Sequence, residues 1–175
     1  MQRNSPFRGL VHSFAIKKRL MKKLALILSV PLIFFLSGGC IKDSQICQQK
    51  TVDSEDAVML SFAAANGITA TKHSSGMYYQ IINPGSGVTP TSTSTLSVKY
   101  KGTLTDGTVF DQQTSPVSFS LGGVILGWQL GMPLIKKGGS IKLIIPSSFG
   151  YGCTANGPIP AYSILYFEID LIDVL

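Results

Sequence analysis

Residues 141–175 read IKLIIPSSFGYGCTANGPIPAYSILYFEIDLIDVL, in which two apolar runs flank a loop of turn-forming residues. The second run alternates apolar and polar positions, which predicts a strand that buries one face. That face carries Leu165, Phe167, Ile169 and Leu171. The first run, over 141–145, is short and bounded by turn signals, as is typical of a buried strand. The loop between them is either a plain connection or a segment shaped to hold a ligand.

Similar segments upstream predict further strands of an antiparallel sheet. They are GMYYQII (76–82), TLSVKYKGTL (95–104), TVFD (108–111) and VSFSL (117–121). Asp106-Gly107 marks a tight hairpin turn between the second and third of these segments. Only GWQLGMPLIKKGG, residues 127–139, predicts a short helix within this region. The pattern indicates an α+β fold in which the sheet packs its apolar side against that helix.

A second helix is predicted ahead of the sheet, within DSEDAVMLSFAAANGI (53–68). Asp53 or Ser54 fits an N-cap, and Gly67 fits the stop. The face expected to be apolar carries Val58, Phe62 and Ala65. We therefore expect a helical extension over residues 54–75 that packs on the domain, with dimerisation as the alternative role.

Positive charge is concentrated at the N-terminus of the 175-residue chain. Residues 1–39 hold seven Lys or Arg and no acid, and the remaining eight basic residues face nine acidic ones. The net charge of +6 therefore belongs to a targeting segment, and nucleic acid is excluded as a partner. Lys22 and Lys23, followed by an apolar run and small residues, fit a secretory signal peptide over 1–39. Met21 fits a natural start, so residues 1–20 need not be translated.

The small residues end in Ser-Gly-Gly-Cys, which resembles a bacterial lipobox. The resemblance implies that Cys40 is lipidated and becomes the mature N-terminus, with residues 40–53 as a lipid-anchored linker to the membrane. An uncleaved signal anchor is the alternative. Ile41 stands where an aspartate often directs retention in the inner membrane. The expected location is therefore the cell envelope, at the outer membrane and facing the periplasm.

Cys47 and Cys153 remain once Cys40 carries lipid. An exported domain occupies an oxidising compartment in which a disulfide can form. Because Cys47 falls in the expected linker, two free thiols are the simpler interpretation. A bridge between these two cysteines is the alternative.

Covalent, metal and cofactor chemistry find little support in the sequence. The chain has two histidines, His12 before the expected mature N-terminus and His73 in a polar stretch. One histidine and two scattered cysteines give no zinc-binding spacing. No phosphate loop or dinucleotide fingerprint is present. We therefore expect no metal and no cofactor, and instead an apolar, aromatic-lined site that binds by shape.

Four motifs follow one another along the second half of the chain. They are VKYKGTLTDGTVFD (98–111), FSLGGVILGWQLGM (119–132), KGGSIKLIIP (137–146) and FGYGCTANGPIPAYSILYFEIDLIDV (149–174). Their order and spacing resemble those of the FKBP-type peptidyl-prolyl isomerases, and the resemblance extends over residues 76–175. It implies a strongly curved antiparallel sheet that wraps a short helix, with an apolar pocket between them.

The resemblance also implies which residues form the pocket. Catalytic roles fall to Phe110, Asp111, Trp128 and Tyr151, and substrate contacts to Tyr100, Phe119, Val124, Ile125, Ile159 and Phe167. Trp128 would be the floor under a proline ring, while the Ile125 N–H and the Tyr151 hydroxyl would donate to substrate carbonyls. The loop quoted above would then overhang the pocket. Taken one at a time, the aromatic residues are equally well explained as ordinary core residues.

The expected function is cis-trans isomerisation of proline-containing, exported polypeptides. Rotation about an Xaa-Pro bond breaks amide resonance and needs no nucleophile or base, which agrees with the scarcity of histidine. One alternative is a proline-binding chaperone or adaptor that uses the same pocket with little turnover. Another is a surface lipoprotein that uses the fold for adhesion. The sequence gives no prediction of oligomeric state.

Overall fold

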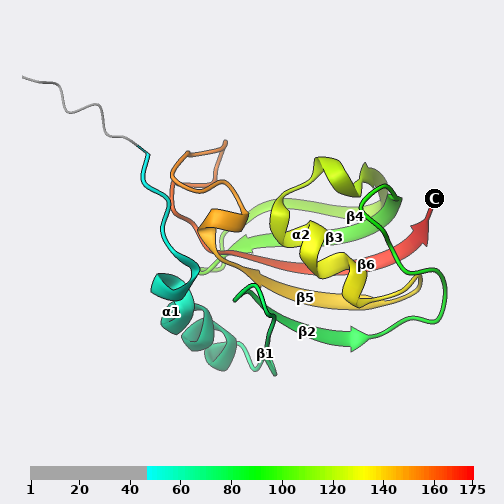
Figure 1. The fold of residues 1–175 in the computed structure, drawn as a ribbon, viewed down its shortest axis with the longest axis horizontal. Coiled ribbons are helices and arrows are strands. Elements are labelled where there is room, and N and C mark those ends of the chain that lie inside the picture. The colour runs from blue at the N-terminus through cyan, green and yellow to red at the C-terminus, as the bar shows by residue number, and fades with distance from the viewer. Residues whose placement is uncertain (1–46) are drawn as a thin grey trace, which may run out of the picture. The chain divides into compact units, whose positions relative to one another are not determined.

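A six-stranded antiparallel sheet is the framework of the computed structural model, which describes residues 47–175. Its strands are β1 (Thr71–Lys72), β2 (Tyr78–Asn83), β3 (Thr95–Leu104), β4 (Val109–Ser120), β5 (Ser140–Ile145) and β6 (Leu165–Val174). They follow the order β1-β2-β5-β6-β3-β4, and every neighbouring pair is antiparallel. The sheet curves around helix α2 (Figure 1), which confirms the predicted α+β fold with a curved sheet and one short helix.

The expected signal peptide, residues 1–39, and the expected lipidation site, Cys40, lie outside the described residues. Within residues 47–175, no helix is both long enough and apolar enough to cross a membrane. The same part of the chain contains no group of three or more histidine, cysteine, aspartate or glutamate side chains placed to hold a metal ion.

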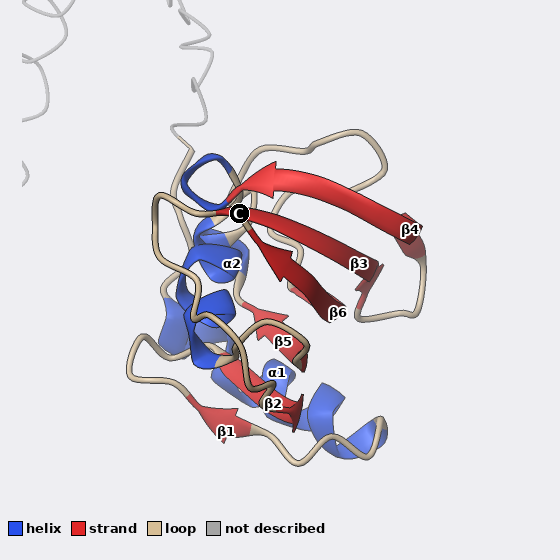
Figure 2. Ribbon diagram, turned by 90° about the vertical axis from the view of Figure 1, so that its right-hand side faces the viewer, coloured by secondary structure: helices blue, strands red, loops and turns tan. Residues whose placement is uncertain are grey.

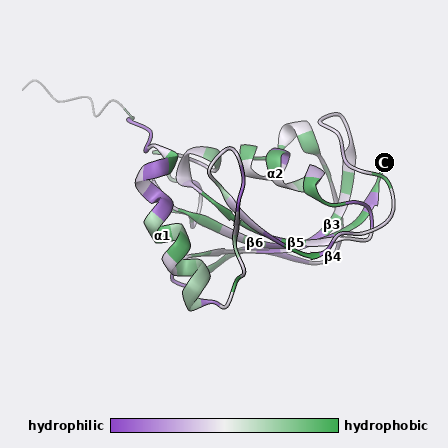
Figure 3. Cartoon of the chain, turned by 60° about the horizontal axis from the view of Figure 1, so that its bottom comes forward, coloured by the Kyte–Doolittle hydropathy of each residue, from purple (hydrophilic) through white to green (hydrophobic). Residues whose placement is uncertain are grey.

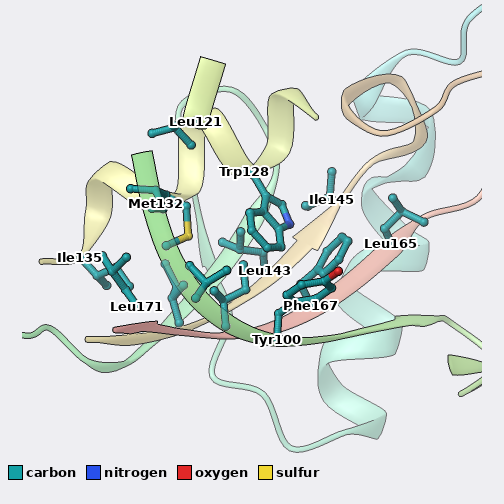
Figure 4. Close-up of a cluster of buried hydrophobic side chains, with 14 of the residues drawn as sticks. Tyr100, Leu121, Trp128, Met132, Ile135, Leu143, Ile145, Leu165, Phe167 and Leu171 are labelled. Carbon is teal, nitrogen blue, oxygen red and sulfur yellow. The ribbon is translucent and has the colours of Figure 1, made fainter. Parts of the chain in front are cut away.

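Helices cover both faces of the sheet (Figure 2). The helical segments are α1 (Val52–Ala65), α2 (Leu126–Gly131) and the 3-10 turns η1 (Leu121–Gly123), η2 (Met132–Leu134) and η3 (Ser147–Phe149). Successive side chains of a strand point to opposite faces, so β5 contributes to two clusters. Leu143 and Ile145 belong to the larger cluster beneath α2 (Figure 4), whereas Ile144 packs with Met59 of α1 on the other face.

The alternation predicted for the last strand is confirmed. The apolar face of β6 consists of Leu165, Phe167, Ile169 and Leu171, and each is at most 5% exposed. Further upstream, the two predicted segments TVFD and VSFSL join into the single strand β4, which contains Pro116. The proline is tolerated because β4 is an edge strand with one neighbour. The β3–β4 register also shifts between Val98 and Tyr100, and such a bulge bends the sheet.

Helix α1 begins earlier than predicted. Its N-cap is Thr51, whose Oγ1 accepts a hydrogen bond from the Ser54 N–H at 3.3 Å. The prediction of Asp53 or Ser54 as the cap is therefore wrong. Thr51 has the extended backbone that a cap requires, whereas both predicted residues already lie in the first turn.

The face of α1 that packs on the sheet also differs from the prediction. Met59 and Ala63 are buried, while Val58 is 51% exposed and Ala65 also faces solvent; of the predicted face, only Phe62 is partly buried. After its hydrophilic first turn the helix is apolar on most sides (Figure 3), so periodicity alone could not select the buried face.

Cys47 and Cys153 form a disulfide, with their Cα atoms 5.6 Å apart. The interpretation of two free thiols is therefore wrong. The two residues are 106 positions apart, and they meet because the segment before α1 lies beside the β5–β6 loop, where Gln49 contacts Gly152. A contact between such distant segments leaves no local pattern in the sequence.

Candidate active site

A cavity of about 460 Å³ opens between the sheet, α2 and the β5–β6 loop. All ten residues of the predicted pocket line it: Tyr100, Phe110, Asp111, Phe119, Val124, Ile125, Trp128, Tyr151, Ile159 and Phe167. Sequence reasoning missed four further lining residues, which are Gly123, Asn156, Gly157 and Pro158. Gly123 directly precedes Val124, and the other three form the NGP sequence that leads into Ile159, which was the signal that could have found them.

The floor of the cavity is an aromatic box around Trp128, the only tryptophan of the chain. The Trp128 ring is 4% exposed and makes edge-to-face contacts with Tyr100, Phe119 and Phe167, at centroid distances of 5.3, 6.1 and 5.3 Å. Phe110 packs against Phe167 in the same way at 5.4 Å. Figure 4 shows Trp128 pointing from α2 toward Tyr100 on β3 and Phe167 on β6. Aromatic pairs with this geometry attract one another, so the box holds its shape.

Two glycines let α2 lie close to the sheet and bring Trp128 into the box. A Cβ added to Gly131 would stand 2.7 Å from the Leu143 side chain, and one added to Gly127 would overlap Ile145. Both glycines are buried. The two glycines of LGWQLG therefore determine how closely α2, and with it Trp128, approaches the sheet.

Asp111 is the only charged residue among those that line the cavity. The Tyr100 hydroxyl donates to Asp111 Oδ2 at 2.5 Å. Burial, and to a smaller extent this hydrogen bond, raise the pKa of Tyr100. The hydroxyl therefore remains a donor at neutral pH and fixes the carboxylate in the wall of the cavity.

Two loops frame the mouth of the cavity. On one side, Gln129 Nε2 donates to the Val124 carbonyl at 2.8 Å and fixes the turn that contains Ile125. On the other side, Asn156 and Ile159 exchange two backbone hydrogen bonds of 2.9 and 3.0 Å. Both turns are thus held by their own hydrogen bonds, which favours a preformed site.

The cavity provides an apolar surface and hydrogen-bond donors, and no histidine or cysteine is among its lining residues. Tyr151 lies at the mouth and is 37% exposed, so its ring can reach a ligand. His73, the histidine of the described segment, forms a hydrogen bond with Ser75 and does not line the cavity. Such a site suits a small apolar ring flanked by polar backbone groups.

The model of the FKBP-type peptidyl-prolyl cis-trans isomerase family matches residues 87–172, a range that includes every residue lining the cavity. FkpA, an FKBP-type peptidyl-prolyl cis-trans isomerase of Escherichia coli (strain K12), is 44% identical over 116 residues. The aligned region covers 65% of this chain and 42% of that protein, so the chain spans less than half the length of this relative.

Two solved structures resemble the fold. The crystal structure of FkpA from Escherichia coli has a TM-score of 0.62 and 41% identity, over 71% of this chain and 59% of that one. The crystal structure of a peptidyl-prolyl cis-trans isomerase from Pseudomonas syringae pv. tomato has a TM-score of 0.61 and 31% identity, over 73% of this chain and 98% of that one. Because the chain covers nearly all of that isomerase and its cavity lies in the matched range, it belongs to the FKBP-type peptidyl-prolyl cis-trans isomerase family.

Proposed function

We propose that this protein is a peptidyl-prolyl cis-trans isomerase that assists the folding of proline-containing, exported polypeptides. The observation that carries the proposal is the aromatic cavity, in which side chains from β3, β4, α2, β6 and two loops meet. Family membership supports the same conclusion.

In this proposal the prolyl ring lies on Trp128, between Phe110 and Phe167. The Ile125 N–H and the Tyr151 hydroxyl donate to the carbonyls that flank the proline. Asp111, held by Tyr100, polarises one edge of the site. Tyr100, Phe119, Val124 and Ile159 complete the apolar wall. The support for these roles is the position of each residue around one cavity.

The reaction needs a site of this kind because of the electronic structure of the imide bond. Rotation breaks amide resonance against a barrier of about 18–20 kcal/mol. The planar ground state is more polar than the twisted transition state, in which charge separation between nitrogen and oxygen is lost. A largely apolar cavity therefore favours the twisted state over the planar one, which is differential binding without bond making.

The proposed location is the cell envelope, with the chain anchored through lipid on Cys40 to the outer membrane and facing the periplasm. The support is the charged, apolar and small-residue order of residues 1–39. The expected bounds were 40–53 for the linker, 54–75 for a helical extension and 76–175 for the isomerase domain. We propose the same order with an earlier start for the helical extension, because α1 begins at Val52 and Cys47 is already joined to the domain by the disulfide. Incorporation of labelled fatty acid into the wild type, and its loss in Cys40→Ser, would test the anchor. Equal labelling of both chains would overturn it.

An isomerisation assay on a short Xaa-Pro peptide, using the purified chain in mild detergent, tests the activity. Trp128→Leu should lower kcat/KM by about tenfold or more, because the floor of the site is lost. Phe62→Leu is the matched control, since Phe62 packs on Tyr166 on the other face of the sheet and should leave the rate unchanged. Peptide binding without rate enhancement in the wild type would favour a proline-binding chaperone or adaptor instead.

A further inference from the structure

We infer that the anchor segment, residues 47–55, positions Tyr151 in the proposed active site and that Glu55 is its main attachment point. The inference rests on the proposed function, because it concerns the direction in which the Tyr151 hydroxyl points. The anchor segment precedes the range matched by the family model, 87–172, so a part of the chain outside that range would tune the site.

Glu55 is a charged residue in a buried position, where a charge is energetically unfavourable. It is 3% exposed, and its Oε2 accepts hydrogen bonds from the Ser147 N–H at 2.7 Å and from Ser147 Oγ at 3.0 Å. Lys50 Nζ stands 3.6 Å from the other oxygen. Removing a carboxylate from water is unfavourable unless partners replace the water. Ser147 replaces it at Oε2, whereas Oε1 has the charge of Lys50 nearby but no hydrogen-bond partner among the described residues. The contact therefore fixes Ser147 to the first turn of α1.

Ser147 transmits this contact to the residues on either side of Tyr151. Its own carbonyl accepts from the Gly150 N–H at 3.0 Å and from the Gly152 N–H at 2.8 Å. Ser147 is fully buried, so these bonds do not compete with water. Tyr151 thus lies on a two-glycine turn whose flanks bind one serine, and Glu55 holds that serine.

A second attachment lies just beyond the turn, at the disulfide between Cys47 and Cys153. Gln49 contacts Gly152, where an added Cβ would overlap the Gln49 amide. Gly152 also has a φ of +60°, a conformation that side-chain-bearing residues rarely adopt. The anchor segment therefore contacts the turn before and after Tyr151.

The direction of Tyr151 depends on this backbone support because its side chain is partly exposed to solvent. It is 37% exposed, and no hydrogen bond to its hydroxyl is found within residues 47–175. A donor at the mouth of a site acts only if it is held in the productive direction, and a small displacement costs rate. Glu55 is far from Tyr151 in sequence, but two successive hydrogen bonds through Ser147 connect it to the glycines on either side of Tyr151.

The test uses the purified full chain and an Xaa-Pro peptide, with kcat/KM measured beside the midpoint of thermal unfolding. Tyr151→Phe should lower kcat/KM about fivefold, the effect of one hydrogen bond. Glu55→Leu should lower it by a similar factor in the wild type and have no further effect in Tyr151→Phe. Glu55→Gln should restore most of the rate, because its amide oxygen can still accept from Ser147.

Asp56→Asn is the matched control, because the neighbouring carboxylate binds Lys72 and Tyr78 rather than the Tyr151 turn. It should leave kcat/KM unchanged. If Glu55→Leu does not fold, reducing the disulfide in the wild type and in Tyr151→Phe makes the same comparison. A rate loss of equal size with and without the Tyr151 hydroxyl, or no loss at all, overturns the inference.

The outcome for the wild type separates this inference from the proposed function. A wild-type chain that gives no rate enhancement overturns the isomerase proposal alone. In that case the role of the anchor segment is tested by measuring the affinity for the peptide, using the fluorescence of Trp128 in the same variants. Weaker binding in Glu55→Leu that is absent in the Tyr151→Phe background supports positioning, and unchanged binding overturns it.

Discussion

At the scale of single residues, the hydrogen bond between Tyr100 and Asp111 contributes both to the stability of the fold and to the geometry of the candidate active site. Tyr100 is 8% exposed, contacts the Trp128 ring and donates its hydroxyl to the carboxylate. Burial and this hydrogen bond raise the pKa of Tyr100, so the native state favours the protonated phenol. The same groups that orient Asp111 therefore make folding sensitive to alkaline pH.

Tyr100→Phe should reduce this alkaline sensitivity. In the wild type the unfolded tyrosine ionises near pH 10, before the folded one, so this part of the stability is present below that pH and is lost as pH rises above it. Urea unfolding from pH 8 to 11 should show a shallower decline for Tyr100→Phe. At pH 7 the variant should be about 1 kcal/mol less stable, because a buried hydrogen bond is lost. Parallel declines in both proteins would contradict the assignment.

At the scale of elements, local patterns predicted strands better than they predicted helix faces. β3 and β6 alternate between buried and more exposed positions over most of their length, so alternation identified them. Helix α1 is apolar on most sides, and its buried face, which carries Glu55, Met59 and Ala63, could not be identified from periodicity. The site residues were found through the order of four motifs, since no single motif shows that strand, helix and loop residues converge. Glu55 could not be assigned a role, because its partner Ser147 lies 92 residues further along the chain.

The packing of α2 on β5 gives a prediction at this scale. Gly131→Ala would place a methyl group 2.7 Å from Leu143, in a core that cannot expand freely, so the free energy of unfolding should fall by about 1–3 kcal/mol. Trp128 lies on the same helix, so its fluorescence should change in the folded state. Gly123→Ala is a matched control for stability, because no atom lies within 4 Å of its added Cβ. An equal decrease in the free energy of unfolding in Gly131→Ala and Gly123→Ala would show that the effect comes from replacing glycine by alanine and not from the contact with Leu143.

At the scale of the whole molecule, the described residues before the family-model match belong to the folded unit. Asp56 of α1 binds Lys72 on β1 at 2.6 Å and Tyr78 on β2 at 2.8 Å. At its N-terminal end the segment is joined to the β5–β6 loop by the disulfide. The N-terminal half of α1 is therefore bonded to β1 and β2 through Asp56, and the segment before the helix is joined to the loop over the cavity through Cys47.

Reduction of this disulfide should destabilise the whole chain. The bridge links residues 106 positions apart, and closing a loop of that length restricts the unfolded chain enough to contribute about 2–5 kcal/mol. Urea unfolding with and without dithiothreitol should therefore show a lower midpoint in the reduced protein. The variant Cys47→Ser with Cys153→Ser should unfold at the reduced midpoint and be insensitive to dithiothreitol. The cell envelope, which is the proposed location, is an oxidising compartment, so the oxidised form is the one expected to act there. If reduction left the midpoint unchanged, the attachment of the N-terminal segment would not contribute to the stability of the domain.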